Sequence, residues 1–232
     1  MAILKSTAFP VTIVILFCLY CTPSVAPLAS IPKPEIHAVR LDISAKLKEA
    51  VHISWSLPQQ ASSTVKSFTL LRMSGADSLY SVISENIPVD THNFWDNLEP
   101  AAFPVSSSEI DTVYYKIFAI DDLERSGDTS EPCTLYLVQQ PVLKSIDLNT
   151  GSISWLSNIH FGGLISYCKI WNDSLNKTFV GPEQPVYPPT DKSAVFTYHI
   201  PLQSISSGHW YYAFFLRISD AHSIRIGDFN VP

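Results

Sequence analysis

Histidine and serine are the side chains of this sequence that could serve a metal site or a nucleophilic reaction. Zinc centres and metalloproteases need short, fixed spacings such as H-E-x-x-H or C-x-x-C. Neither spacing is present, and no G-x-S-x-G turn marks a nucleophilic serine. The sequence therefore predicts a protein that is not an enzyme and that uses no metal or other cofactor. Its histidines are His37, His52, His92, His160, His199, His209 and His222.

The acidic run "DDLE" (Asp121 to Glu124) is the one local cluster of carboxylates that suggests a cation site. Calcium prefers six or more oxygen ligands, which two carboxylates in a turn do not supply. We therefore expect an ordinary solvated loop here.

Two glycosylation sequons, "NDS" at Asn172 and "NKT" at Asn176, lie within one short polar stretch. In a eukaryotic secretory pathway either asparagine is a candidate acceptor for a glycan. In a bacterial protein the two sequons would carry no meaning. The sequence leaves both alternatives open.

The first 29 residues have the layout of a secretory signal peptide. Lys5 supplies the positive start, Val11 to Cys21 is an uncharged apolar run, and Thr22 to Ser30 is rich in small residues. We expect cleavage after Ala29, and a protein that is secreted or extracytoplasmic (in the periplasm or at the cell surface, if bacterial). The alternative is an uncleaved N-terminal anchor.

Composition narrows the class of partner. The chain has 232 residues, 46% of them hydrophobic and 16% charged, with a net charge of -6. A nucleic-acid-binding protein needs a clustered basic face, which this balance does not provide. We therefore expect no nucleic-acid partner, and contact with a membrane only if the N-terminal segment stays uncleaved.

Strands with a period of two residues should form the fold. Val51, Ile53, Trp55 and Leu57 would share one face of a strand, with polar residues on the other face. Short polar turns separate such segments, which predicts an all-β protein built from sandwiches.

The chain also contains an internal repeat. "VHISWSLP" (Val51 to Pro58) matches "GSISWLS" (Gly151 to Ser157), and a double tyrosine recurs at Tyr114 and Tyr211. A period near 100 residues indicates duplication of a whole domain. The Pro-containing "VQQPV" (Val138 to Val142) is the best predicted boundary.

Both copies resemble fibronectin type III domains. In the first copy the matching motifs are "ISWSLP", "FTLLR" (Phe68 to Arg72), "YKIFAID" (Tyr115 to Asp121) and "SEP" (Ser130 to Pro132). The resemblance implies two immunoglobulin-like (fibronectin type III) β-sandwiches in tandem, spanning residues 33–138 and 141–232, the second more divergent. Aligned in this way, Cys168 replaces a core aromatic residue, which implies a buried thiol that is not paired with Cys133.

An apolar strand is the strongest feature that the fold does not explain. Both faces of "GHWYYAFFLRI" (Gly208 to Ile218) are hydrophobic, although an outer sheet face should be polar. One interpretation is cover by a loop of the same domain, Gly181 to Pro189. The other is a binding face or a domain–domain contact. The candidate binding residues are Trp210, Tyr212, Phe214 and Leu216, with Tyr114 and Phe118 in the first copy.

These observations predict an exported, non-catalytic protein-binding or adhesion module whose partner is a protein or a cell-surface ligand. One alternative is an accessory or carbohydrate-binding component of a secreted enzyme system. Another is a receptor-like ectodomain, although the paired cysteines and the Trp-Ser-x-Trp-Ser motif of cytokine receptors are absent. Because a fold does not fix a function, the binding role rests on the resemblance.

Overall fold

The computed structural model describes residues 30–58, 65–75, 77–98, 103–104, 110–158, 163–186 and 193–232. Residues 31–232 form one compact unit. The predicted signal peptide, residues 1–29, lies outside the described residues. Within the described part of the chain, no helix is long and apolar enough to cross a membrane.

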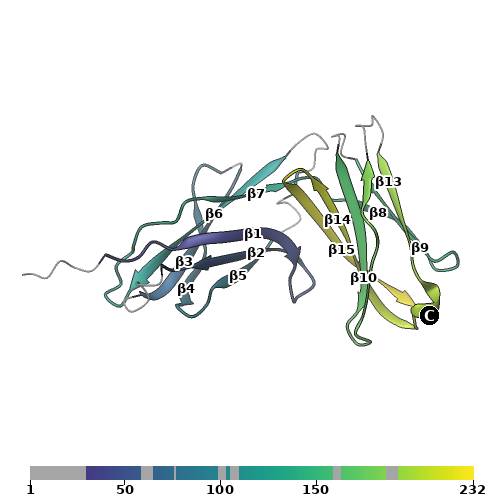
Figure 1. Ribbon diagram of the computed structural model, residues 1–232, viewed down its shortest axis with the longest axis horizontal. Helices are drawn as coiled ribbons and strands as arrows, with labels where there is room; N and C mark the ends of the chain where they lie inside the picture. Colours follow the sequence, from purple (N-terminus) through teal and green to yellow (C-terminus); the bar gives the residue numbers. More distant parts are fainter. Residues whose placement is uncertain are drawn as a thin grey trace, which may run out of the picture. The chain divides into compact units, whose positions relative to one another are not determined.

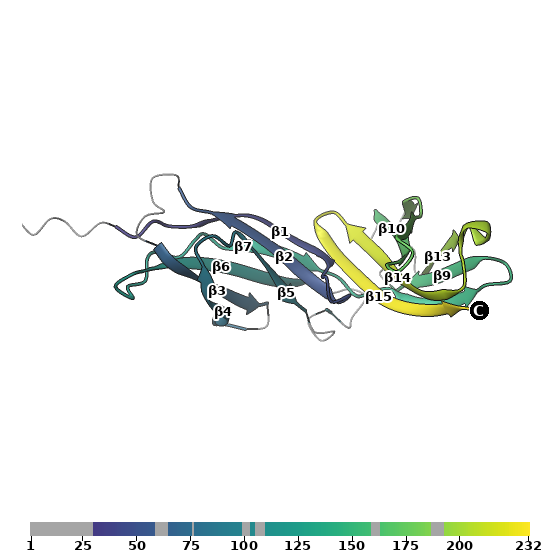
Figure 2. The same ribbon diagram turned by 90° about the horizontal axis from the view of Figure 1, so that it is seen from below.

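Seven antiparallel strands in two sheets build the first half of this unit (Figures 1 and 2). One sheet has the order β1-β2-β5, and the other runs β4-β3-β6-β7. The strands are β1 (Glu35–Ile43), β2 (Glu49–Ser56), β3 (Val65–Ser74), β4 (Ser81–Pro88), β5 (Asn93–Asn97), β6 (Asp111–Asp121) and β7 (Cys133–Leu137).

Alternation of side chains creates the first core. Val51, Ile53 and Trp55 of β2 are all buried, as the period of two predicts. Trp55 meets Phe68 of β3 edge to face, with ring centroids 5.8 Å apart. The two sheets therefore enclose one apolar layer, as in a β-sandwich.

The second half adds one further sheet, of order β13-β9-β8. Its other layer is the run β11-β10-β14-β15, with β12 also paired to β10, and this run belongs to the same nine-stranded sheet as β4-β3-β6-β7. Trp155 is central to the second core, stacked between Phe196 and Phe214 at centroid distances of 5.7 and 4.7 Å. The elements are β8 (Val142–Asp147), β9 (Ser152–Ser157), β10 (Leu164–Asn172), β11 (Lys177–Val180), β12 (Gln184–Val186), β13 (Ala194–His199), the 3-10 turn η2 (Leu202–Ser204), β14 (Gly208–Ile218) and β15 (Ala221–Val231).

The predicted all-β sandwich class is confirmed by these sheets, and each half has its own core. The repeated tryptophans occupy equivalent strands, because Trp55 lies on β2 and Trp155 on β9, each in a three-stranded sheet. Seven strands in two sheets is the arrangement that the fibronectin type III resemblance implies for the first half.

The connection between the halves is part of the packed structure. Val138 is fully buried in the second core, and its N–H donates to the carbonyl oxygen of His222 at 3.0 Å. A short parallel pair joins β15 to β7 through Ala221↔Tyr136 and His222↔Leu137. The domain limits 33–138 and 141–232 remain a prediction.

Candidate functional site

The apolar residues predicted as a binding face on β14 line the second core. Trp210, Tyr212, Phe214 and Leu216 are at most 6% exposed. Their assignment to an outer surface is therefore wrong. The internal repeat contained a signal for the correct orientation. When the two double tyrosines are aligned, Tyr212 corresponds to Tyr115, whose side chain points into the first core.

The opposite face of β14 is the unusual one. Tyr211 and Phe215 are half-buried, and each stacks on an aromatic ring of β10. Tyr211 lies 5.6 Å from Trp171 and Phe215 lies 4.5 Å from Tyr167, measured between ring centroids. Aromatic pairs on neighbouring strands stabilise a sheet through contact across the ladder.

This face of β14 has a partner within the same compact unit. Leu41, Ile43 and Leu47, from β1 and the turn after it, pack against a buried cluster of three residues, and so do Tyr211 and Phe215. The cluster consists of Trp171, Ala213 and Ile224. The Glu49 Oε1 atom also accepts a hydrogen bond from the Ile226 N–H at 3.1 Å. These contacts correspond to the predicted domain–domain alternative. Part of the alternative covering loop, residues 187–189, lies outside the described residues.

Tyr114 and Phe118 project from the outer side of β6, as predicted. Both are half-buried, whereas Val113, Tyr115, Ile117 and Ala119 on the inner side are buried. Across the ladder Tyr114 pairs with Met73 of β3, which is also only partly covered. In β4, Val82 is 50% exposed and continues the apolar surface beside Leu71.

We call this surface the β6 face. Near its centre the Lys116 ammonium lies 4.9 Å from the centroid of the Tyr80 ring, an arrangement that favours cation–π attraction. Burial, with a smaller contribution from Tyr114, raises the pKa of Tyr80, so this phenol stays neutral and can donate a hydrogen bond. The residues of the β6 face are Leu71, Met73, Tyr80, Val82, Tyr114, Lys116 and Phe118.

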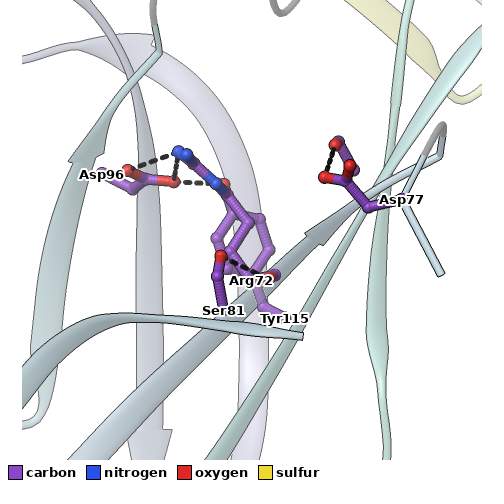
Figure 3. Close-up of polar contacts among 6 residues, drawn as sticks. Arg72, Asp77, Ser81, Asp96 and Tyr115 are labelled. Carbon is purple, nitrogen blue, oxygen red and sulfur yellow. Dashed lines mark hydrogen bonds and ion pairs between the residues drawn. The ribbon is translucent and has the colours of Figure 1, made fainter. Parts of the chain in front are cut away.

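A polar cluster lies on the inner side of the same sheet (Figure 3). The Arg72 guanidinium donates to both Asp96 oxygens, at 3.0 and 2.8 Å, and the Tyr115 hydroxyl donates to Asp96 at 2.8 Å. Burial and the nearby Asp96 raise the pKa of Tyr115 far above its ordinary value. Because the carboxylate is fully engaged, the cluster acts as a lock between strands and offers no free acid or base.

Sequence reasoning missed this cluster. Arg72 was identified only as part of a strand motif, and nothing linked it to Asp96, which is 24 positions away. A signal was present, since "FWD" (Phe94 to Asp96) places a carboxylate directly after two aromatic residues of one strand. A buried carboxylate requires a partner of opposite charge.

The acidic run after β6 is a structured turn. Asp121 is 3% exposed and accepts hydrogen bonds from the backbone N–H groups of Leu123 and Arg125 at 3.0 and 2.8 Å. The Arg125 guanidinium donates to its other oxygen at 2.8 Å. Burial alone would raise the pKa of Asp121, but these hydrogen bonds hold it below its ordinary value. The Asp121 carboxylate therefore stabilises the turn through these hydrogen bonds.

Both cysteines that the structure describes are free thiols. Cys168 is buried in the second core, as the fibronectin type III resemblance implies, and Cys133 on β7 is partly covered. Burial raises the pKa of each thiol, which disfavours the reactive thiolate. Neither is placed as a nucleophile.

Metal-binding geometry is absent from the described residues, where no three His, Cys, Asp or Glu side chains converge. A cavity of about 240 Å³ lies beside the outer face of β14. It is lined by Arg217 and His222, and burial, together with Arg217, lowers the pKa of His222. Its other polar lining residues are Asp42, Tyr167, Glu183 and Ser223.

No family model and no curated protein matches the chain. Among solved structures, the selenomethionine-substituted chicken interferon gamma receptor alpha chain is 10% identical, and the match covers 88% of this chain and 100% of that one, with a TM-score of 0.31. The FN1-FN3 domains of chicken CNTN1 are 12% identical over 87% of this chain, with a TM-score of 0.33. This chain spans 66% of the CNTN1 chain. These TM-scores are too low to support an inference about function.

Proposed function

We propose that the chain is an exported, non-catalytic protein-binding or adhesion module that contacts its partner through the β6 face. The observation that carries the proposal is that Tyr114 and Phe118 are partly exposed on a sheet side that is normally polar. No hydrophobic core cluster of the described residues includes either ring. The matching row on β14 differs, because its Ala213 belongs to a buried cluster against which Leu41, Ile43 and Leu47 pack.

The composition of the β6 face suits a protein partner. Tyrosine, phenylalanine and methionine are enriched where proteins meet, and they dominate binding energy when they become fully covered. Lys116 lies among them, so we expect an apolar partner surface with a carboxylate placed to meet this ammonium group. The rigid sheet beneath would hold the rings in place before binding.

Paired substitutions test the proposal. Tyr114→Ser and Phe118→Ser should each lower binding of the purified chain to cells of its native host at least tenfold, because each removes a ring that binding would bury. Val195→Ser, at a valine that is 53% exposed on β13, makes a comparable change elsewhere and should leave binding unchanged. Circular dichroism would check that each variant folds.

A glycan array run in parallel separates the carbohydrate-binding alternative. Specific binding to one sugar that survives both β6-face substitutions would overturn the protein-binding proposal in favour of that alternative. The receptor-like alternative predicts another pattern. Cell binding would depend on Tyr114 and Phe118 and would occur only where one particular receptor ligand is present. The intact mass of the chain recovered from its host tests export, since cleavage after Ala29 should leave Ser30 as the first residue.

A further inference from the structure

The two glycosylation sequons occupy one tight turn but differ in accessibility. Asn172 is the last residue of β10 and Asn176 directly precedes β11. The turn is closed by a hydrogen bond from the Asn176 N–H to the Asp173 carbonyl oxygen at 3.1 Å. The two acceptor side chains therefore belong to one hairpin, and their surroundings can be compared directly.

The Asn172 side chain is committed to the fold. It belongs to a residue only 4% exposed, and its Nδ2 atom donates to the His209 carbonyl oxygen at 2.8 Å. Its Oδ1 atom accepts from the Leu175 N–H at 2.9 Å, which shapes the turn. An N-linked glycan is bonded to this same Nδ2 atom, so a sugar at Asn172 would have to fit where the side chain is buried against β14.

Asn176 has the opposite character. It is exposed at the tip of the turn, and its φ of 50° is a left-handed conformation that asparagine tolerates well. Within the described part of the chain its side chain makes no hydrogen bond. Thr178, the third residue of its sequon, is also exposed on β11. The whole sequon can thus carry a bulky group on the folded surface.

We propose that Asn176 carries an N-linked glycan and that Asn172 does not. This assignment rests on the proposed export of the chain, through a eukaryotic secretory pathway. The glycan would stand beside β11, which ends the order of its sheet and, among the strands that the structure describes, pairs only with β10. Val180 on this edge strand is 61% exposed. A bulky hydrophilic group there blocks pairing with strands of other chains, a protection that exposed edges need.

Two substitutions, one for each sequon, remove the sequons without altering either asparagine. Thr178→Val abolishes the Asn176 sequon and keeps a β-branched residue in β11. Ser174→Ala abolishes the Asn172 sequon. The full chain and both variants would be produced in a eukaryotic secretory cell and treated with a peptide N-glycosidase. We expect one glycan on the wild-type chain and on Ser174→Ala, no glycan on Thr178→Val, and the modified peptide to contain Asn176.

A tail of sequence Asn-Gly-Thr added after Pro232 reports whether each chain reaches the secretory lumen. A glycosylated tail with an unmodified Asn176, or a glycan that survives Thr178→Val and is lost in Ser174→Ala, would overturn the assignment. The same chains with residues 1–29 replaced by an established leader separate the two proposals. If the tail is glycosylated only in the chain with the foreign leader, the native first 29 residues do not direct export. A glycan at Asn176 in the chain with the foreign leader would still support Asn176 as the modified residue.

Discussion

Buried charge decides local stability at the residue scale, and Asp96 is the clearest case. Its side chain is 9% exposed and receives hydrogen bonds from Arg72 and Tyr115. Asp96→Ala should lower the free energy of unfolding by about 3 kcal/mol, near the low end for a broken buried pair, because 34% of the Arg72 side chain reaches solvent. Tyr115→Phe removes one hydrogen bond to a carboxylate and should cost about 1.5 to 3 kcal/mol. Urea unfolding measures both.

A matched control lies in the same half of the chain. Asp77 is an exposed carboxylate whose partner is the nearby Ser74 hydroxyl (Figure 3). Asp77→Ala should change the free energy of unfolding by less than about 0.5 kcal/mol, as is usual for surface positions. If Asp96→Ala cost no more than Asp77→Ala, the cluster could not be the lock between strands described above.

Side-chain alternation, at the element scale, was readable for most strands, but the orientation of one strand was not. Val51, Ile53 and Trp55 alternate with polar residues, and the structure buries them as expected. On β14 both faces are apolar, so hydrophobicity carries no information about which face is inside. The outcome depends on contacts distant in sequence: Trp155 stacks on Phe214, and Leu41 packs against the same buried cluster as Phe215.

Substitutions on the two faces of β14 test that orientation. Phe214→Ala should cost about 3–5 kcal/mol, because this fully buried ring is stacked on Trp155 and its removal leaves a cavity. Phe215→Ala should cost about 1–2 kcal/mol, since its ring is only half-buried. Chemical denaturation of both variants measures the difference. A larger loss for Phe215→Ala would mean that the strand faces the other way.

The boundary between the halves is the feature of the whole molecule that sequence patterns obscure. "VQQPV" has the proline and polar residues of a linker, yet Val138 is in the second core. The Gln140 Nε2 atom donates to the Ile224 carbonyl oxygen at 2.7 Å, and the Ser223 hydroxyl donates to the Gln139 carbonyl oxygen at 3.0 Å. Such contacts join residues 84 positions apart, which no local pattern reveals.

The stability of an isolated second domain should therefore depend on whether the fragment includes residues 138–140. We expect a fragment of residues 138–232 to be more stable than residues 141–232 by at least about 2 kcal/mol, from the burial of Val138 and the hydrogen bonds of the segment. Urea unfolding of both fragments measures this. In the full chain, Val138→Ala should destabilise the second half, whereas Val142→Ala, at a valine that is 50% exposed, should have almost no effect. If the two fragments were equally stable, residues 138–140 would be a linker, and the second domain would begin at Pro141.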